Sequence, residues 1–129
     1  MADKTILIVD DLPDMRTLIR VTLEEIGARV LEAGDIATAQ TLLHAHHPDL
    51  ALLDMMVQED LDGYRLCQSI KLDPELQQTR VLMLSARGQM NEVMTGFEAG
   101  ADDYLIKPFS TQDLLERVRR LLTQQNCPL

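Results

Sequence analysis

Short runs of consecutive apolar residues alternate with amphipathic segments along the whole chain. The four most regular runs are Ile6–Val9, Leu50–Leu53, Val81–Leu84 and Tyr104–Ile106. Because their apolar residues follow one another without polar alternation, these runs are typical of strands buried on both faces. A shorter strand is predicted near Arg29–Glu32. The alternation of strands and helices predicts an α/β domain, with a doubly wound, five-stranded parallel sheet covered by five helices.

Capping and turn residues set the expected helix limits. Pro13 suits the first turn of a helix, and Gly27 predicts that helix's end. Asp35 predicts an N-cap for the second helix, and Ser110 opens a near capping box for the last. The fourth helix is expected around Glu92–Ala99. The residues expected to face the core are Leu18, Ile19, Thr22, Leu23, Ile26, Ile36, Ala39, Leu42, Leu43, Tyr64, Leu66, Cys67, Ile70, Leu114, Leu115, Val118 and Leu121.

Each regular run ends in a reactive polar side chain. In chain order these side chains are Asp10, Asp11, Asp54, Ser85 and Lys107. Right-handed crossovers place the carboxyl ends of parallel strands at one edge of the sheet. In open α/β sheets this edge is where ligands bind. We therefore expect three carboxylates, a hydroxyl and an ammonium group to gather there.

Such a set can hold a divalent metal and receive a phosphoryl group. Neighbouring carboxylates raise one another's pKa, so the cluster is most stable around a hard cation, and oxygen ligands select Mg²⁺. Asp54 can act as the nucleophile, because carboxylates form aspartyl-phosphates. Lys107 would balance charge on one phosphoryl oxygen, and Ser85 would donate a hydrogen bond to another. Phosphoryl transfer needs no general base, since it depends mainly on positioning and charge stabilisation.

These motifs resemble those of the response-regulator receiver domains of two-component signal transduction. The matching segments are Val9-Asp10-Asp11, Leu53-Asp54, Leu84-Ser85-Ala86, Gly100-Ala101-Asp102-Asp103-Tyr104 and Lys107-Pro108-Phe109. Together they are highly specific, and the likeness covers roughly residues 4–122. The resemblance implies one receiver domain over residues 1–129, with a short tail at 123–129. It also implies a flavodoxin-like sheet with strand order 2-1-3-4-5.

The resemblance assigns the phosphoacceptor and the metal ligands. It implies that Asp54 receives the phosphoryl group from a histidine kinase or a phosphotransfer protein. Mg²⁺ would be held by Asp10, Asp11, Asp54 and the backbone carbonyl of Met56. A protein of this kind phosphorylates itself, with possible loss of the phosphoryl group by its own hydrolysis. It is not an enzyme that acts on other substrates.

The resemblance also assigns a switch. Ser85 would shift toward the phosphoryl group, and Tyr104 would then turn inward, changing the binding of a downstream effector or output domain. The bond between Lys107 and Pro108 is expected to be cis. In DNA-binding members of the family the last helix and fifth strand form a two-fold interface, which implies a possible homodimer through that surface here.

The loop after Asp54 departs from the family pattern. Relatives usually have proline four residues after the acceptor and glycine eight after it, whereas this chain has Gln58 and then Gly63, nine residues on. The loop is therefore one residue longer, and it carries the additional acids Glu59, Asp60 and Asp62. The assignment that depends most on this loop is the Met56 carbonyl.

Charge and composition exclude several classes of function. The net charge is −9, so we expect no direct contact with nucleic acid. No apolar stretch approaches the roughly 18 residues that span a bilayer. The chain begins without a signal-peptide pattern, and Cys67 and Cys127 lack metal-site spacing. These features predict a cytoplasmic protein with reduced cysteines.

Other interpretations remain open. The main alternative is a constitutive interaction module with the same fold and no phosphorylation. An aspartyl-phosphate phosphatase would carry Asp-x-Asp after the first strand, and a dinucleotide binder would carry a glycine-rich turn there. The triplet His44, His46 and His47 is expected to meet a helix dipole rather than a metal. For Arg117, Arg119 and Arg120 the expected partners are Asp102, Asp103 and Glu116.

Overall fold

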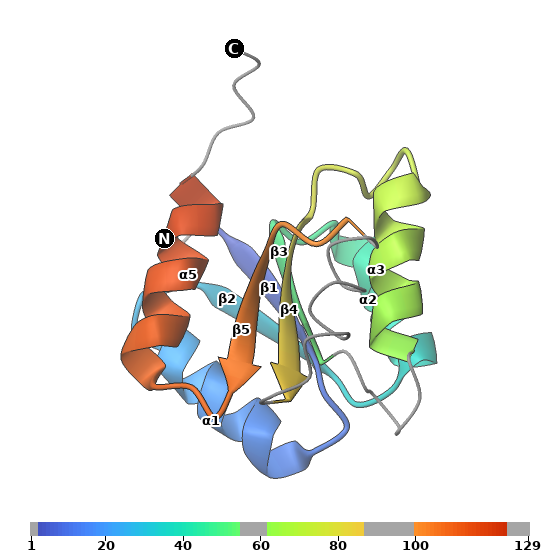
Figure 1. Ribbon diagram of the computed structural model, residues 1–129. Helices are drawn as coiled ribbons and strands as arrows, with labels where there is room; N and C mark the ends of the chain where they lie inside the picture. The colour runs from blue at the N-terminus through green and yellow to red at the C-terminus, as the bar shows by residue number, and fades with distance from the viewer. Residues whose placement is uncertain (1–2, 55–61, 87–99, 124–129) are drawn as a thin grey trace.

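A computed structural model of the chain describes residues 3–54, 62–86 and 100–123. Five parallel strands form one sheet in the order β2-β1-β3-β4-β5, as predicted (Figure 1). The strands are β1 (Thr5–Val9), β2 (Arg29–Ala33), β3 (Leu50–Asp54), β4 (Arg80–Ala86) and β5 (Asp103–Lys107). This order, with helices on both faces, is that of the flavodoxin-like doubly wound fold.

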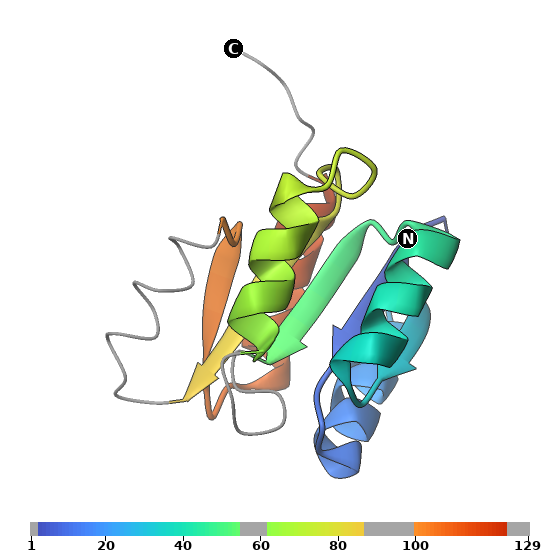
Figure 2. The ribbon, with the colours of Figure 1, turned by 90° about the vertical axis from the view of Figure 1, so that its right-hand side faces the viewer.

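Helices cover the two faces of the sheet in pairs. They are α1 (Pro13–Glu24), α2 (Ile36–His46), α3 (Asp62–Leu72) and α5 (Thr111–Thr123). Figure 1 shows α1 and α5 on one face, and Figure 2 looks onto α2 and α3 on the other. The helix expected around Glu92–Ala99 lies outside the described residues. Within the described residues no helix is long and apolar enough to cross a membrane.

The core consists of two apolar layers, one on each side of the sheet. Successive residues of a strand point to opposite faces, and here both faces are buried. In β1, Ile6 and Ile8 face the layer beneath α1 and α5, whereas Leu7 and Val9 face the layer beneath α2 and α3. Uninterrupted apolar runs are therefore required by burial on both sides, as the sequence indicated.

Most of the predicted capping residues act as expected. The Asp35 carboxylate accepts a hydrogen bond from the Thr38 amide at 2.7 Å, and the Ser110 hydroxyl accepts one from the Asp113 amide at 3.0 Å. Gly27 follows the end of α1 with φ of 80°, a conformation that favours glycine. Asp35 and Ser110 each accept a hydrogen bond from a backbone amide in the first turn of a helix, and Gly27 ends one. Such local interactions can be predicted from sequence patterns.

The prediction that Leu18 faces the core was wrong. Leu18 is 47% exposed, whereas Ile19, Thr22 and Leu23 of the same helix are buried. The residue before Ile19 is rotated by about 100° around a helix of 3.6 residues per turn. Only one of these two neighbours can lie at the centre of the buried stripe, and in α1 it is Ile19.

Candidate functional site

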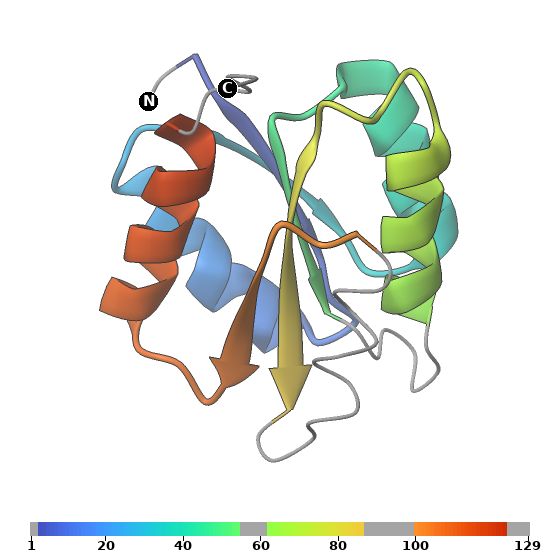
Figure 3. The same ribbon diagram turned by 45° about the horizontal axis from the view of Figure 1, so that its top comes forward.

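The three predicted carboxylates meet at the carboxyl edge of the sheet, toward which the strand arrows point in Figure 3. Asp10 and Asp11 follow β1, and Asp54 ends β3. One carboxylate oxygen from each of the three lies within 4.8 Å of the others. The parallel pairing of β1 with β3, in which Val9 is opposite Leu53, brings these side chains together. The structure thus confirms that the strand ends gather an acidic cluster.

Lys107 completes this group from the end of β5. Its ammonium nitrogen Nζ lies 3.5 Å from Asp10 Oδ2 and 3.4 Å from Asp54 Oδ2. The bond from Lys107 to Pro108 is cis, as expected. One cation therefore serves two of the three acids, and the cluster keeps an excess of negative charge.

Asp10 is buried and hydrogen-bonded through both its backbone and its side chain. Its side chain is 0% exposed. Its backbone amide donates to the Ala33 carbonyl at 3.1 Å, and its Oδ1 accepts from the Leu12 amide at 2.9 Å. Its carbonyl accepts from Nη1 of Arg16 at 2.7 Å. Sequence reasoning missed Arg16 at this site, since its spacing from Asp10 is not that of any strand end.

Burial raises the pKa of Asp10 above its ordinary value, because the charged form loses its hydration. The hydrogen bond from Leu12 and the charge of Lys107 oppose this shift, and the charge of Asp54 adds to it. Burial and the neighbouring Asp54 both disfavour the charged form of Asp10, which lies beside two other acids. A bound cation would stabilise that charged form. The cluster fits Mg²⁺ in ligand type, and opposite ligands of Mg²⁺ lie about 4.2 Å apart, close to the span of these oxygens.

Ser85 and Tyr104 lie on the neighbouring strands β4 and β5. Ser85 is buried at the end of β4 and pairs in register with Ile106. Tyr104 is 6% exposed and belongs to the apolar layer beneath α2 and α3. The inward position, which the resemblance assigned to the phosphorylated form, is therefore the one that the structure has.

The longer loop after Asp54 falls mostly outside the described residues. Met56 and Gln58 lie in this part of the chain, so the carbonyl ligand assigned to Met56 stays a prediction. Gly63 is buried within α3.

The basic residues of α5 pair with only one of the acids expected for them. Arg117 Nη1 lies 2.9 Å from Asp103 Oδ1, and Arg120 also pairs with Asp103. The expectation for Asp102 was wrong, because its carboxylate pairs with Lys71 at 2.8 Å and with Arg80 at 3.5 Å. Asp102 precedes β5, on the side that faces α3 and β4, and so it cannot share the partners of Asp103.

A second group of possible ligands lies away from this cluster. His44 Nε2 is 3.0 Å from Asp73 Oδ2, and His44 Nδ1 is 2.9 Å from the Gln40 carbonyl. Oxygen atoms of Asp73 and Glu75 and a ring nitrogen of His44 lie within 4.8 Å of one another. Because both neighbours of the ring are acceptors, the protonated imidazole satisfies both, and the pKa of His44 is raised, first by the Gln40 carbonyl and then by Asp73.

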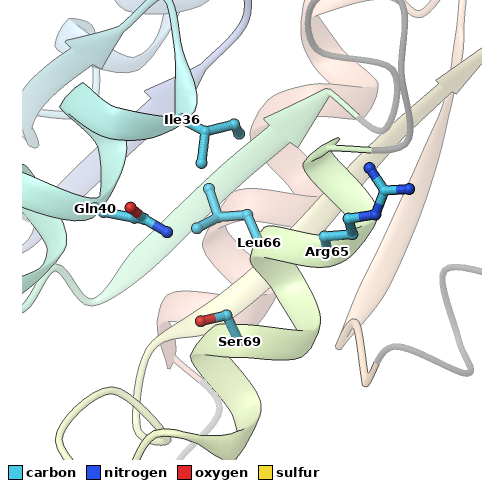
Figure 4. Close-up of a pocket in the computed structure, with 5 residues that line it drawn as sticks. All are labelled: Ile36, Gln40, Arg65, Leu66 and Ser69. Atoms are coloured by element: carbon cyan, nitrogen blue, oxygen red, sulfur yellow. The ribbon is translucent and has the colours of Figure 1, made fainter.

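A pocket of about 200 Å³ opens between α2 and α3, as Figure 4 shows. It is lined by Ile36, Gln40, Arg65, Leu66 and Ser69. None of these residues belongs to the predicted site, and no carboxylate is among the described residues of the lining. The acidic cluster, rather than this pocket, is therefore the candidate for phosphoryl chemistry.

Comparison with known proteins agrees with this assignment. Residues 6–119 match the family described as the response regulator receiver domain. RpaA, a DNA-binding dual master transcriptional regulator from Synechocystis sp., is 43% identical over 117 residues, which cover 91% of this chain and 48% of RpaA. PhoB, the phosphate regulon transcriptional regulatory protein of Pseudomonas aeruginosa, is 39% identical over 122 residues, which cover 95% of this chain and 53% of PhoB.

A candidate response regulator from Chloroflexus aurantiacus has a solved structure that matches with a TM-score of 0.88 at 35% identity, covering 94% of this chain and 98% of that one. The chain spans about half the length of the curated relatives that it matches. Family, fold and strand-end residues agree over nearly the whole sequence. The chain belongs to the response regulator receiver domain family.

Proposed function

We propose that this chain is a phosphorylation switch in which Asp54 accepts a phosphoryl group from a histidine kinase or a phosphotransfer protein. The observation that carries the proposal is the convergence of three carboxylates within 4.8 Å, with Lys107 within 3.5 Å of two of them. A cluster with this charge at the carboxyl edge is suited to a cation and a phosphoryl group together. The chain takes the phosphoryl group itself and has no external substrate.

The transfer exchanges one bond to phosphorus for another. A carboxylate oxygen of Asp54 forms the new O–P bond while the P–N bond of the donor's phosphohistidine breaks. The electron pair of that bond returns to the imidazole nitrogen. Lys107 already lies 3.4 Å from Asp54 Oδ2, so its ammonium group can pair with a phosphoryl oxygen at the same place. Ser85 would donate its hydroxyl hydrogen to another oxygen.

We assign the metal-binding role to Asp10, Asp11 and Asp54. Bound there, Mg²⁺ supplies charge neutralisation for the acidic cluster and the incoming phosphoryl group. Asp10 is ready for this role because its Oδ1 is occupied by the Leu12 amide, which leaves Oδ2 on the side of Lys107. The Asp10 carboxylate is therefore held in position before any ligand arrives.

Intact-mass measurement after incubation with acetyl phosphate and Mg²⁺ tests the proposal. The wild type is expected to gain one phosphoryl group, and Asp54→Asn is expected to gain none. Asp14→Asn is a matched control, because Asp14 is exposed in the first turn of α1. Equal labelling of wild type and Asp54→Asn would refute the acceptor assignment.

The alternative is a constitutive interaction module that binds its partners without phosphorylation. It predicts no labelling by acetyl phosphate and no effect of Mg²⁺ on stability. The buried charge of Asp10 argues against this alternative, since a structural role would be served at lower cost by a neutral residue.

The signal would leave the site through the pairing of β4 with β5. Met83 pairs in register with Tyr104, and Ser85, two residues further along β4, pairs with Ile106. A shift of Ser85 toward a phosphoryl group would therefore move the strand that contacts Tyr104. We propose that phosphorylation stabilises the inward Tyr104 and thereby sets the surface of β5 and α5 that partners read.

That surface is also where we place a phosphorylation-dependent homodimer. β5 is an edge strand, and Ile106 on it is 44% exposed. Arg117 and Arg120 line the adjoining helix, and both already pair with Asp103 of the same chain. A dimer would have to share or exchange these pairs, which makes the interface sensitive to charge. That the chain itself makes no contact with nucleic acid stays a prediction from its net charge of −9.

Sedimentation with and without a phosphoryl mimic tests the dimer. Ile106→Asp is expected to keep the protein monomeric in the presence of the mimic. Leu72→Asp is the matched control, since Leu72 is an exposed apolar residue at the end of α3. A monomer under both conditions for the wild type would refute dimerisation.

A further inference from the structure

Arg16 contacts the peptide unit that joins the first two acids of the cluster. Its guanidinium nitrogen Nη1 donates to the carbonyl of Asp10 at 2.7 Å. That carbonyl belongs to the peptide between Asp10 and Asp11, and the two acidic side chains project from the Cα atoms at its ends. The orientation of this peptide therefore contributes to the positions of both carboxylates.

Arg16 is itself held in place by β2 and the residue that follows it. Its Nε lies 3.5 Å from Oε1 of Glu32, and Glu32 is the neighbour of Ala33, whose carbonyl accepts the Asp10 amide at 3.1 Å. The guanidinium group thus connects α1, the end of β1 and β2 at one point. A side chain that is held by three elements loses its conformational entropy on folding. It can then orient the peptide without a further entropic cost when a cation binds.

Gly34 leaves the space that the guanidinium group occupies. A Cβ added at this position would lie 2.9 Å from Arg16 Nη1. The arginine end would have to move, which would strain its hydrogen bond to the Asp10 carbonyl. Glycine at position 34 therefore leaves Arg16 free to take the position that it has in the structure.

The charge of Arg16 is compensated outside the cluster. Glu32 supplies the opposite charge, whereas Lys107 approaches the carboxylates of Asp10 and Asp54 directly. Arg16 can therefore orient the acids without cancelling the negative charge that a cation needs. This distinguishes its contribution from that of Lys107.

We propose that Arg16, supported by Glu32 and Gly34, is a positioning residue for the acidic cluster and sets its affinity for a divalent cation. It acts through the peptide between Asp10 and Asp11 and not by contact with the cation. The inference rests on the proposed function, because the cation is the one that the phosphorylation site uses. Groups that orient metal ligands in this way commonly change metal affinity by about 10–100-fold when they are removed.

Calorimetric titration with Mg²⁺ tests the affinity. Arg16→Gln is expected to weaken Mg²⁺ binding by about 10-fold or more. Arg20→Gln is the matched control, because this substitution also removes one positive charge from α1. Arg20 lies one turn further along the helix and pairs with Glu32 at 3.1 Å. The control is expected to bind Mg²⁺ within about twofold of the wild type, since partly exposed ion pairs contribute little.

Two further variants separate position from charge. Gly34→Ala changes no charge but pushes the Arg16 guanidinium group away from its present position, so it is expected to weaken Mg²⁺ binding in the same direction. Arg16→Lys keeps the charge but cannot contact Asp10 and Glu32 with one planar group, so it is expected to remain weak. Wild-type affinity in Gly34→Ala, or full affinity in Arg16→Lys, would overturn the proposal.

Amide hydrogen exchange provides a measurement that needs neither metal nor phosphoryl group. The Leu12 amide, bonded to Asp10 Oδ1, is expected to exchange faster in Arg16→Gln than in Arg20→Gln when both are equally stable to urea. Equal exchange in the two variants would refute the positioning role. A wild type that binds no Mg²⁺ would instead refute the proposed function, and the exchange data would still decide on Arg16.

Discussion

Replacement of Asp10 by asparagine should stabilise the metal-free protein and remove its response to Mg²⁺. Asparagine is close to isosteric with aspartate, and its carbonyl oxygen can still accept the hydrogen bond from the Leu12 amide. What it removes is one buried negative charge from a group of three. Burial raises the pKa of Asp10, with a further rise from Asp54, so ionisation of this acid near neutral pH opposes folding.

The magnitude follows from the distances. At an effective dielectric constant of about 20, two like charges no more than 4.8 Å apart repel by about 3.5 kcal/mol or more. Asp10 has two such neighbours, and the attraction of Lys107 at 3.5 Å returns about 5 kcal/mol. The repulsions therefore exceed the attraction by about 2 kcal/mol, and screening at the half-buried Asp11 and Asp54 reduces the net effect to about 1 kcal/mol. For a domain of this size that corresponds to a rise in melting temperature of about 4 °C.

Thermal unfolding with a chelator and with excess Mg²⁺ measures both halves of the prediction. With chelator, Asp10→Asn should melt above the wild type. At a Mg²⁺ concentration 100 times its Kd, the wild type should gain about 2.7 kcal/mol and overtake the variant, which should not respond. The order of the two proteins is thus expected to reverse. A variant less stable than the wild type in chelator would show that Lys107 outweighs the acids, and an equal Mg²⁺ response would refute the metal assignment.

Three further predictions concern the rest of the fold. His44→Gln should lose stability relative to the wild type at pH 6 but not at pH 9. The raised pKa of His44 means that its protonated form stabilises the folded protein below the unfolded pKa of about 6.5, and this gain disappears as pH rises through the folded pKa. Urea unfolding across this pH range measures the difference. Ser110→Ala should cost about 1 kcal/mol, and Ser110→Thr much less, because the hydroxyl caps α5. Leu23→Ala should cost about 2–5 kcal/mol, whereas Leu18→Ala in the same helix should cost under about 0.5 kcal/mol.

Each of these predictions can fail independently. A pH-independent effect of His44→Gln would mean that Asp73 does not hold a charged imidazole. Equal losses in the alanine and threonine variants of Ser110 would point to packing instead of capping. A large loss in Leu18→Ala would contradict the exposed position of that residue.

The parallel sheet and the strand-end chemistry could be predicted because both depend on local signals and topology, whereas the strand order was implied by the family resemblance. An uninterrupted apolar run such as Leu50–Leu53 is buried on both faces wherever it lies in a parallel sheet, and the polar residue after it must lie at the edge. Asp35 and Ser110 were predictable for a similar reason, since a cap acts on amides two or three residues away. These features involve no choice between distant partners.

Distant partners could not be predicted. Asp102 and Asp103 are adjacent in sequence, yet Asp102 pairs with Lys71 and Asp103 with Arg117. The selection depends on which side of β5 each residue faces and on how closely α3 and α5 approach it. The contact of Arg16 with the Asp10 carbonyl was missed for a different reason, because its target is a backbone atom, which side-chain patterns do not reveal.

Asp10 illustrates how this fold prepares a cation site without neutralising it. Its amide, its carbonyl and its Oδ1 are each bonded to a partner that is neutral or already compensated by another charge, namely Ala33, Arg16 with Glu32, and Leu12. These bonds fix the position of the carboxylate but leave its charge nearly intact. Because Lys107 is shared between two acids, it cannot cancel the excess. The free energy that opposes folding of the metal-free protein is therefore available to favour any ligand that brings positive charge to this edge.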